Sequence, residues 1–213
     1  MVPADMEDLA FASDHLRAGE SLVFPTDTVY GLGASCGIES AVLRLYRIKG
    51  RPLDKPIPIL LADPDDVTSM AKGVSALAER LIARFFPGPL TLVLTKADSV
   101  PDWVTAGRDS IAVRVPDHPF ARSLIRGLGS PLAATSANLA GQPAPVTAQE
   151  AKAQLGELVS LVLDGGPCPG GVESTVLDLT GPSPAVLRKG AIPLEALEEV
   201  CGRILNMLEW KAS

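Results

Sequence analysis

Three cations that could bind phosphate stand close together after the end of a predicted helix. Lys49, Arg51 and Lys55 lie on a stretch of chain that Pro52 and Pro56 make stiff. Stiff backbone lowers the entropy cost of holding like charges together, and arginine and lysine side chains both suit phosphate oxygens. The segment therefore indicates a small polyanion site, with a solvated basic helix face as the alternative interpretation.

A second polar segment, residues 25–33, directly follows a predicted strand and combines hydroxyl groups, a carboxylate and two glycines. Binding residues are often found on such loops, which a rigid scaffold positions. A small-molecule site and an ordinary capped turn explain the segment equally well.

Arg114 lies inside a predicted strand, residues 111–115, whose side chains alternate between two faces. The three apolar side chains of this strand point one way, and Ala112 and Arg114 point the other way. An arginine in a strand is costly to bury unless an anion meets it. A carboxylate ligand and a structural salt bridge would both meet that need.

Residues 134–138 follow another predicted strand, and Glu173, Ser174 and Arg188 come later in the chain. Their hydroxyl, amide and guanidinium groups suit phosphates or a ribose. Each of these segments, taken alone, would be an ordinary turn.

Several common catalytic and metal sites are excluded. The chain has no Gly-x4-Gly-Lys-Ser/Thr phosphate loop. His15 and His118 are its only histidines, they are expected at the surface, and without a His/Cys cluster no metal site is predicted. No serine, cysteine or histidine forms an evident nucleophile–base pair, so any chemistry should depend on positioning and electrostatics.

Composition places the chain in the class of globular proteins. Its 213 residues are 46% hydrophobic and 21% charged, which predicts a single domain over residues 1–213. No apolar run approaches the roughly 20 residues of a membrane span, and the acidic N-terminus does not resemble a signal peptide. Cys36, Cys168 and Cys201 are odd in number and far apart, which favours a reducing cytoplasm.

Charge is unevenly distributed. The chain carries a net charge of −6, which disfavours binding to nucleic acid by bulk charge. Residues 44–55 nevertheless contain five cations and one acid, a local net charge of +4.

Hydrophobic periodicity predicts an α/β sandwich around one mixed sheet, because helices alternate irregularly with strands that sometimes follow one another directly. The apolar stripes of the predicted helices span residues 6–16, 38–48, 74–85 and 194–208. Thr147 and Glu150 form a capping box that predicts a helix towards Leu155, and Pro193 suits a first helical position. The predicted strands are 21–24, 57–61, 90–95, 111–115, 132–135, 161–164, 175–179 and 185–188.

These segments together, in this order, resemble the YrdC-like family of L-threonylcarbamoyladenylate synthases. The resemblance covers the chain from about Leu9 to Arg188. It is carried by Pro-Thr-Asp-Thr-Val-Tyr-Gly-Leu-Gly from Pro25, Lys49-x-Arg51-Pro52, Pro87-Gly88-Pro89-Leu90-Thr91, Val113-Arg114-x-Pro116, Ser136-Ala137-Asn138 and Ser174-Thr175-Val176.

The resemblance implies a reaction and a site. L-threonine, bicarbonate and ATP would give threonylcarbamoyl-adenylate, pyrophosphate and water. The implied fold is a twisted α/β sheet, flanked by helices, that curves around a positively charged cavity. Mg²⁺ would accompany the phosphates with few protein ligands. The product would pass to the tRNA threonylcarbamoyltransferase machinery, and weak binding of tRNA itself is compatible with the family.

The family's residue roles transfer as follows. The threonine site would comprise Thr28, Arg114 and Ser174, and the ATP site Arg51, Lys55, Ser110, Ser136, Asn138, Ala144 and Arg188. Lys49, Arg51 and Lys55 would neutralise charge on the leaving pyrophosphate, with no protein nucleophile required.

Two positions depart from the family's pattern: Leu60 stands where longer members often carry a histidine, and Ala144 offers only backbone. The chain resembles the short, single-domain form. Because a carbamate decomposes in water, a lid is expected at residues 141–147 or 165–171.

Two other functions were compared with the synthase. One is a non-catalytic module that binds RNA, against which the net charge argues. The other is the carbamoyl transfer of hydrogenase-maturation proteins, whose acylphosphatase and zinc-finger-like segments are absent from this sequence.

Overall fold

The computed structural model describes residues 1–5 and 8–204 of the chain. Within them, no helix combines the length and the apolar character that crossing a membrane requires. The strands are β1 (Val2–Pro3), β2 (Leu22–Phe24), β3 (Gly31–Ser35), β4 (Ile59–Leu60), β5 (Leu90–Thr95), β6 (Ser110–Arg114), β7 (Leu132–Ser136), β8 (Leu161–Asp164), β9 (Thr175–Asp178) and β10 (Ala185–Arg188). The α-helices are α1 (Leu9–Arg17), α2 (Glu39–Lys49), α3 (Val67–Met70), α4 (Ala76–Phe85), α5 (Asp102–Thr105), α6 (Pro119–Leu128), α7 (Ala148–Leu155) and α8 (Leu194–Cys201).

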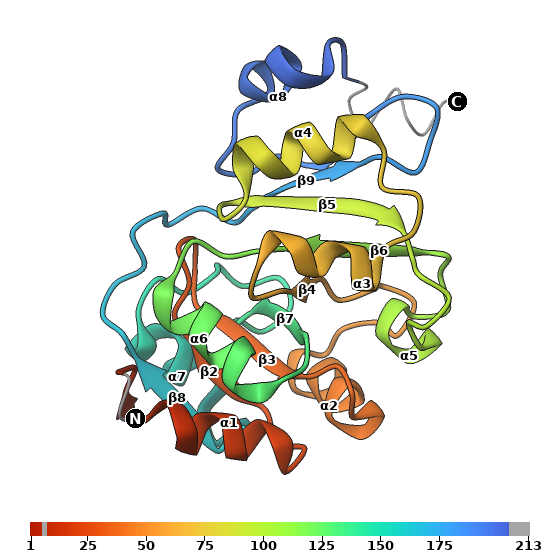
Figure 1. Ribbon diagram of the computed structural model, residues 1–213. Helices are drawn as coiled ribbons and strands as arrows, with labels where there is room; N and C mark the ends of the chain where they lie inside the picture. The colour runs from red at the N-terminus through yellow and green to blue at the C-terminus, as the bar shows by residue number, and fades with distance from the viewer. Residues whose placement is uncertain (6–7, 205–213) are drawn as a thin grey trace.

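All the described strands belong to one mixed sheet, in the order β1-β8-β2-β3-β7-β4-β6-β5-β9-β10. β2 runs parallel to β8, β4 to β6 and β5 to β9, whereas β3 lies antiparallel to both β2 and β7. Figure 1 shows the sheet extending from β8, near the N-terminus, to β9 beneath α4. The predicted fold class, a mixed sheet with flanking helices, is confirmed.

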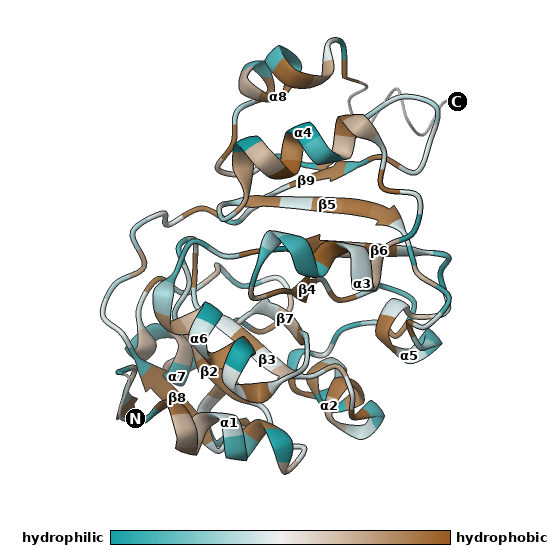
Figure 2. Cartoon of the chain, viewed as in Figure 1, coloured by the Kyte–Doolittle hydropathy of each residue, from teal (hydrophilic) through white to brown (hydrophobic). Residues whose placement is uncertain are grey.

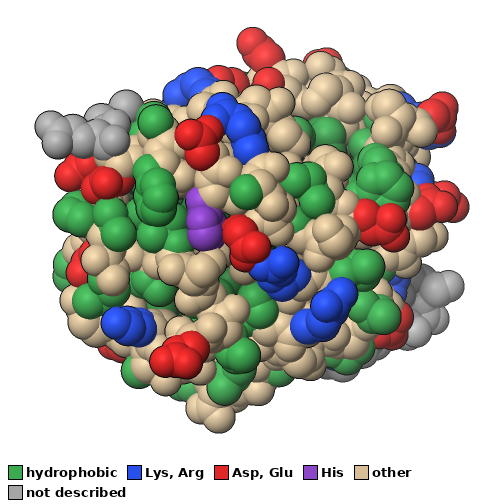
Figure 3. All heavy atoms as spheres, turned by 90° about the horizontal axis from the view of Figure 1, so that it is seen from below, with side chains coloured by type: hydrophobic (Ala, Val, Ile, Leu, Met, Phe, Trp, Pro, Cys, Tyr) green, Lys and Arg blue, Asp and Glu red, His purple; other side chains and the backbone are tan. Residues whose placement is uncertain are grey.

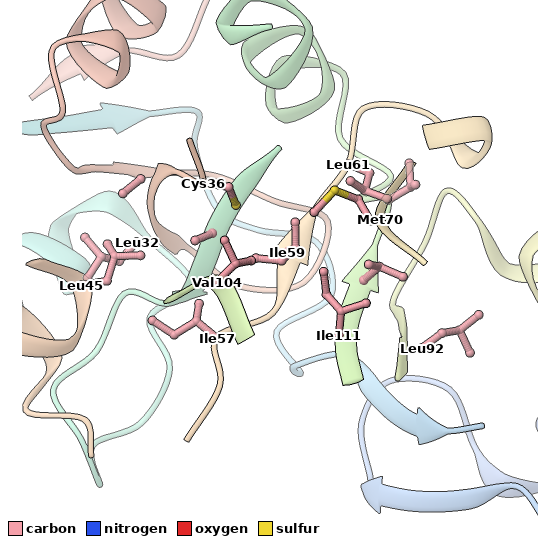
Figure 4. Packing of buried hydrophobic residues seen from close by; sticks show 14 of the residues in the cluster. Leu32, Cys36, Leu45, Ile57, Ile59, Leu61, Met70, Leu92, Val104 and Ile111 are labelled. Carbon is pink, nitrogen blue, oxygen red and sulfur yellow. The ribbon is translucent and has the colours of Figure 1, made fainter. Parts of the chain in front are cut away.

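The two faces of the sheet bury different clusters of apolar side chains. The larger cluster includes Ile59, Val113 and Leu92, from three neighbouring strands, and packs against α2, α4 and α8. Figure 4 shows Leu32 of β3 and Leu45 of α2 together in this cluster. In Figure 2 apolar colouring continues along β5 and β9, which are covered by α4. This face forms the main hydrophobic core.

The opposite face is covered only in part. Helices α1 and α6 pack on each other and on β2 and β8 through the second cluster, which includes Leu16, Phe24 and Leu124. On the same face, Leu60 of β4 stands beside Arg114 of β6, and Val93 of β5 stands beside Ala112. That half of the face carries a mixture of polar and apolar side chains, and the cavity described below lies there.

The ends of several helices follow the predicted signals. Gly50 ends α2 in the left-handed conformation with φ +63°. Thr147 and Glu150 form the predicted capping box at the start of α7. Pro193 is the residue before the first turn of α8 and not its first helical residue, because its ψ of 155° is extended.

Other predicted elements need correction. Residues 31–35 form β3 and not a loop, and the strand predicted over residues 57–61 is reduced to Ile59–Leu60. Helix α6, which follows His118, was not predicted. Helix α8 ends at Cys201. Met6, Leu205 and Leu208 of the predicted stripes lie outside the described residues.

Candidate active site

A cavity of about 640 Å³ lies on the partly covered face of the sheet, within the size range of small-molecule sites. Its floor includes Ala112 and Arg114, so the alternation predicted for this strand is confirmed. The charged side chains that line it, among the described residues, are Arg51, Lys55, Arg108, Arg114, Glu173 and Arg188.

Arg114 is held at one end of the cavity by groups from two other segments. Its Nη1 donates to Thr28 Oγ1 at 3.0 Å, its Nε donates to the Gly88 carbonyl at 3.0 Å, and its Nη2 pairs with the Asp27 carboxylate. The Arg114 side chain is 8% exposed and the Asp27 side chain 10%. The structural salt bridge is therefore present, and Arg114 lines the cavity as well.

Ser174 stands at the same end, between neighbouring strands. Its hydroxyl lies 2.8 Å from Thr91 Oγ1, and Arg188 donates to its carbonyl at 2.9 Å and to its Oγ at 3.0 Å. Nη1 of Arg188 also donates to Glu173 Oε1 at 3.0 Å. Two cavity cations, Arg114 and Arg188, are thus each paired with a carboxylate.

The cationic segment after α2 forms a compact loop at the cavity wall. Arg51 Nε donates to the Lys55 carbonyl at 2.9 Å, and Arg51 Nη2 donates to the Pro56 carbonyl at 2.8 Å. These contacts preorganise the loop, and burial lowers the pKa of the Arg51 guanidinium. Both Arg51 and Lys55 line the cavity, as a polyanion site requires.

Lys49 occupies a different position from its two sequence neighbours. It is buried, and its ammonium donates to the Ser136 carbonyl at 2.6 Å, to Ser136 Oγ at 3.0 Å and to Asn138 Oδ1 at 2.6 Å. These three partners match the three N–H donors of a lysine. Burial lowers the pKa of Lys49 from 10.5 to about 8. Lys49 does not itself line the cavity, although Ser136, which it holds, does.

The structure thus brings together most of the predicted site. The predicted residues that line the cavity are Thr28, Arg51, Lys55, Arg114, Ser136, Ser174 and Arg188. Those that do not line it are Lys49, Ser110, Asn138 and Ala144. Leu60 also lines the cavity, beside Arg114 in register, so it places an apolar side chain where longer family members often carry a histidine.

Two charged lining residues had no predicted role. Glu173 was noted only as part of a polar turn, and Arg108 was not noted at all. Arg108 belongs to a short polar loop whose sequence carries no binding signal. Only the fold reveals that its Nη2 reaches the Asp54 carbonyl, at 3.0 Å, across 54 positions of the chain.

Both candidate lid segments contact the polar segment that contains Asp27, Thr28 and Tyr30. Gly170 and Gly171 donate backbone hydrogen bonds to the carbonyls of Asp27 and Thr28, at 3.0 and 2.9 Å. The Tyr30 backbone N–H donates to the Pro145 carbonyl at 2.8 Å. Closure by either segment stays a prediction.

On the face seen from below in Figure 3, lysine and arginine side chains are interspersed with acidic and apolar ones. Among the described residues, no group of three or more His, Cys, Asp or Glu side chains could hold a metal ion.

The sequence of the chain is similar to those of several threonylcarbamoyl-AMP synthases. It is 44% identical to a threonylcarbamoyl-AMP synthase of Pyrococcus abyssi over 92% of this chain and 58% of that protein. It is 40% identical to a putative threonylcarbamoyl-AMP synthase of Mycobacterium tuberculosis over 88% of this chain and 86% of the relative. The chain therefore spans less than two thirds of the Pyrococcus relative and most of the mycobacterial one.

Solved structures match as well. P. abyssi Sua5 in a crystal structure with L-threonine superposes with a TM-score of 0.92 at 43% identity, covering 95% of this chain and 59% of that one. E. coli YciO superposes with a TM-score of 0.83 at 30% identity, covering 91% of this chain and 94% of that one. The family model named Sua5, YciO and YrdC, described as "Telomere recombination", matches residues 14–190. By sequence and by structure, the chain belongs to the Sua5/YciO/YrdC family.

Proposed function

We propose that this chain is a threonylcarbamoyl-AMP synthase, which converts L-threonine, bicarbonate and ATP to threonylcarbamoyl-adenylate, pyrophosphate and water. The observation that carries the proposal is the charge layout of the cavity. Two of its cations, Arg114 and Arg188, are each paired with a carboxylate, and Arg51, Lys55 and Arg108 take part in no ion pair among the described residues. Such a layout suits a zwitterionic amino acid beside the paired cations and a triphosphate beside the others.

The names of the relatives support the same activity. Proteins 40–44% identical over most of this chain are named threonylcarbamoyl-AMP synthases. The P. abyssi Sua5 structure that superposes closely contains L-threonine.

The threonine site would be formed by Thr28, Arg114 and Ser174. Their polar groups come from three segments that already hydrogen-bond to one another or to their neighbours, so little reorganisation is needed to receive the amino acid. Leu60 beside Arg114 would provide an apolar contact for the threonine methyl group.

The reaction needs no covalent enzyme intermediate. The threonine amine and bicarbonate form a carbamate with loss of water, and a carbamate oxygen attacks the α-phosphorus of ATP. The bond from the α-phosphorus to its bridging oxygen breaks, and that oxygen leaves with pyrophosphate. Arg51 and Lys55 would neutralise the charge that develops on the leaving group, and the cavity would hold the reactants in line.

Lys49, Ser110, Asn138 and Ala144 would act from behind or beside the cavity wall. The Lys49 ammonium holds the Ser136 carbonyl and hydroxyl, so we assign Lys49 the positioning of Ser136 for the nucleotide. Asn138 would support it through its contact with Lys49, and Ser110 and Ala144 would contribute at the cavity's edge.

Mg²⁺ fits this site if phosphate oxygens and water supply most of its ligands, as is common for this ion. Glu173 is the carboxylate that lines the cavity among the described residues, so it could add a protein oxygen. Bound there, Mg²⁺ would neutralise phosphate charge.

The product would serve the threonylcarbamoyl modification of tRNA, through a separate transferase. We place this activity in the cytoplasm, where ATP and tRNA are available and where three free cysteines would stay reduced.

The proposal is tested by measuring pyrophosphate release while one reactant at a time is omitted. Release that needs ATP, L-threonine and bicarbonate together is expected. Release that persists without threonine or without bicarbonate would contradict it. A parallel titration of tRNA at several salt concentrations tests the RNA-binding alternative, which predicts a steep loss of affinity with salt.

A further inference from the structure

Arg108 is a cavity cation to which neither the sequence nor the family resemblance gives a role. It lies in the loop between α5 and β6, is exposed, and lines the cavity. Its Nη2 donates to the Asp54 carbonyl at 3.0 Å, which links its loop to the loop that carries Arg51 and Lys55. Arg108 therefore stands where two loops meet at the cavity.

The backbone before Arg108 is held in an unusual turn. Ala106 has φ 54° and Gly107 has φ 74°, and Ala106 is the one non-glycine residue with positive φ among the described residues. Thr105 Oγ1 donates to the Arg108 carbonyl at 2.8 Å, and the Arg108 N–H donates to the Thr105 carbonyl at 3.2 Å. A left-handed alanine costs free energy, and such backbone is often retained at ligand-binding positions. The turn therefore fixes the position of the Arg108 backbone, from which its side chain extends.

The ion pairs of the cavity divide its cations into two groups. Arg114 pairs with Asp27, and Arg188 pairs with Glu173. None of the ion pairs among the described residues includes Arg51, Lys55 or Arg108. No carboxylate of the described residues therefore forms an ion pair that would compete with a ligand for these three cations.

Strand β6 separates Arg108 from Arg114 along the cavity. Arg114 is its last residue, at the threonine end, and Arg108 lies two residues before its first. From its first to its last residue this strand spans roughly 13 Å. Arg108 therefore lies away from Arg114 and, through its contact with the Asp54 carbonyl, beside the loop whose Arg51 and Lys55 would meet the phosphates.

We infer that Arg108 binds the terminal phosphates of the nucleotide and so makes the site select a triphosphate over a monophosphate. This inference rests on the proposed function. Arg108 still has donors beyond the one that contacts Asp54, because a guanidinium carries five N–H groups. It can hold the Asp54 loop and a phosphate oxygen at once.

The test compares the affinities of ATP, pyrophosphate and AMP for the unaltered chain and for Arg108→Ala, measured by calorimetry. Arg80→Ala is the matched control, because Arg80 is exposed on α4, which packs on the other face of the sheet. A charge-assisted hydrogen bond predicts a loss of about tenfold or more for ATP and pyrophosphate in Arg108→Ala. AMP affinity should stay unchanged, and Arg108→Lys should recover part of the loss because it keeps the charge.

The outcomes separate this inference from the proposed function. ATP and pyrophosphate affinities that survive Arg108→Ala would overturn the inference alone, as would an equal loss for AMP or an Arg108→Lys variant as weak as alanine. An unaltered chain that binds neither ATP nor pyrophosphate would overturn the proposed function and this inference with it.

Discussion

The Lys49 ammonium donates to Asn138 Oδ1 at 2.6 Å and thereby ties the end of α2 to the turn after β7. The other two donors of Lys49 are engaged by Ser136. A phosphate would have to displace one of these partners in order to reach the lysine. The proposed assignment is therefore that Lys49 positions Ser136, and that Arg51 and Lys55 meet the phosphates.

The lowered pKa of Lys49 predicts a pH dependence of stability. Below about pH 8 the lysine is charged in both the folded and the unfolded chain, and its burial costs free energy. Between about pH 8 and its ordinary value of 10.5, the unfolded chain binds the proton that the folded chain has lost. The free energy of unfolding should therefore rise with pH across this window.

Urea denaturation measures this free energy for the unaltered chain and for Lys49→Met. Above pH 8 the free energy of unfolding of the unaltered chain should increase relative to that of the variant. A difference between the two that stays constant with pH would contradict the buried ammonium.

Asp27 should be important for stability because it compensates a buried guanidinium. Removing one partner of a buried ion pair typically costs about 3–5 kcal/mol, and both side chains of the Arg114–Asp27 pair are nearly inaccessible. Asp27→Ala should lower the free energy of unfolding by that amount in urea denaturation. Asp98→Ala is the control, because the Lys72–Asp98 pair is exposed and its loss should have no measurable effect. Equal effects of the two substitutions would argue against a buried pair.

Gly190 allows the backbone of residues 173–175 to approach closely. A Cβ at this position would lie 2.4 Å from the Glu173 carbonyl oxygen, the Ser174 carbonyl carbon and the Thr175 nitrogen. Gly190→Ala must therefore displace the backbone that carries Ser174, with a cost of about 1–3 kcal/mol and a weaker affinity for threonine. Gly181→Ala is the matched control, because its added Cβ would meet only the Ser183 carbonyl, at 3.8 Å. Calorimetric titration with threonine measures the effect, and unchanged affinity in Gly190→Ala would show that Ser174 does not contact the amino acid.

Lys55 should act on the nucleotide more than on the amino acid. Lys55→Ala removes one of the cavity cations without a carboxylate partner, so the KM for ATP should rise more than the KM for threonine. Steady-state kinetics of both substrates measure the two changes, with Lys152→Ala on exposed α7 surface as the control. The reverse order would contradict the division of the cavity into two ends.

The sequence predicted those parts of the fold that local signals determine. The capping box of α7 and the strands β5, β8 and β10 were found with correct bounds, because periodicity and turn residues mark them. Strand β3 was missed because it contains two glycines, which are poor strand formers. The structure shows why glycine stands in this strand, because a Cβ on Gly33 would lie only 2.8 Å from the Phe24 ring. That constraint comes from tertiary packing, which sequence periodicity does not contain.

The site was predicted to the extent that motifs carry it. Of the residues to which the resemblance gave a role, the structure places seven in the lining of the cavity. It could not distinguish Lys49 from its neighbours, because burial depends on which face of α2 packs inward. Ala41 and Leu45 precede Lys49 at intervals of four and are buried, so a helical-face argument could have placed it inside. Arg108 had no such signal, because only the fold brings it to Asp54.

The most direct test of the account follows the carbon of bicarbonate. The chain is incubated with ATP, L-threonine and ¹⁴C-labelled bicarbonate, and the nucleotide products are separated. The account predicts one labelled product that contains threonine, one carbon from bicarbonate and AMP in equal amounts, formed together with pyrophosphate. Label that never enters a nucleotide, while ATP and threonine are both bound, would contradict it.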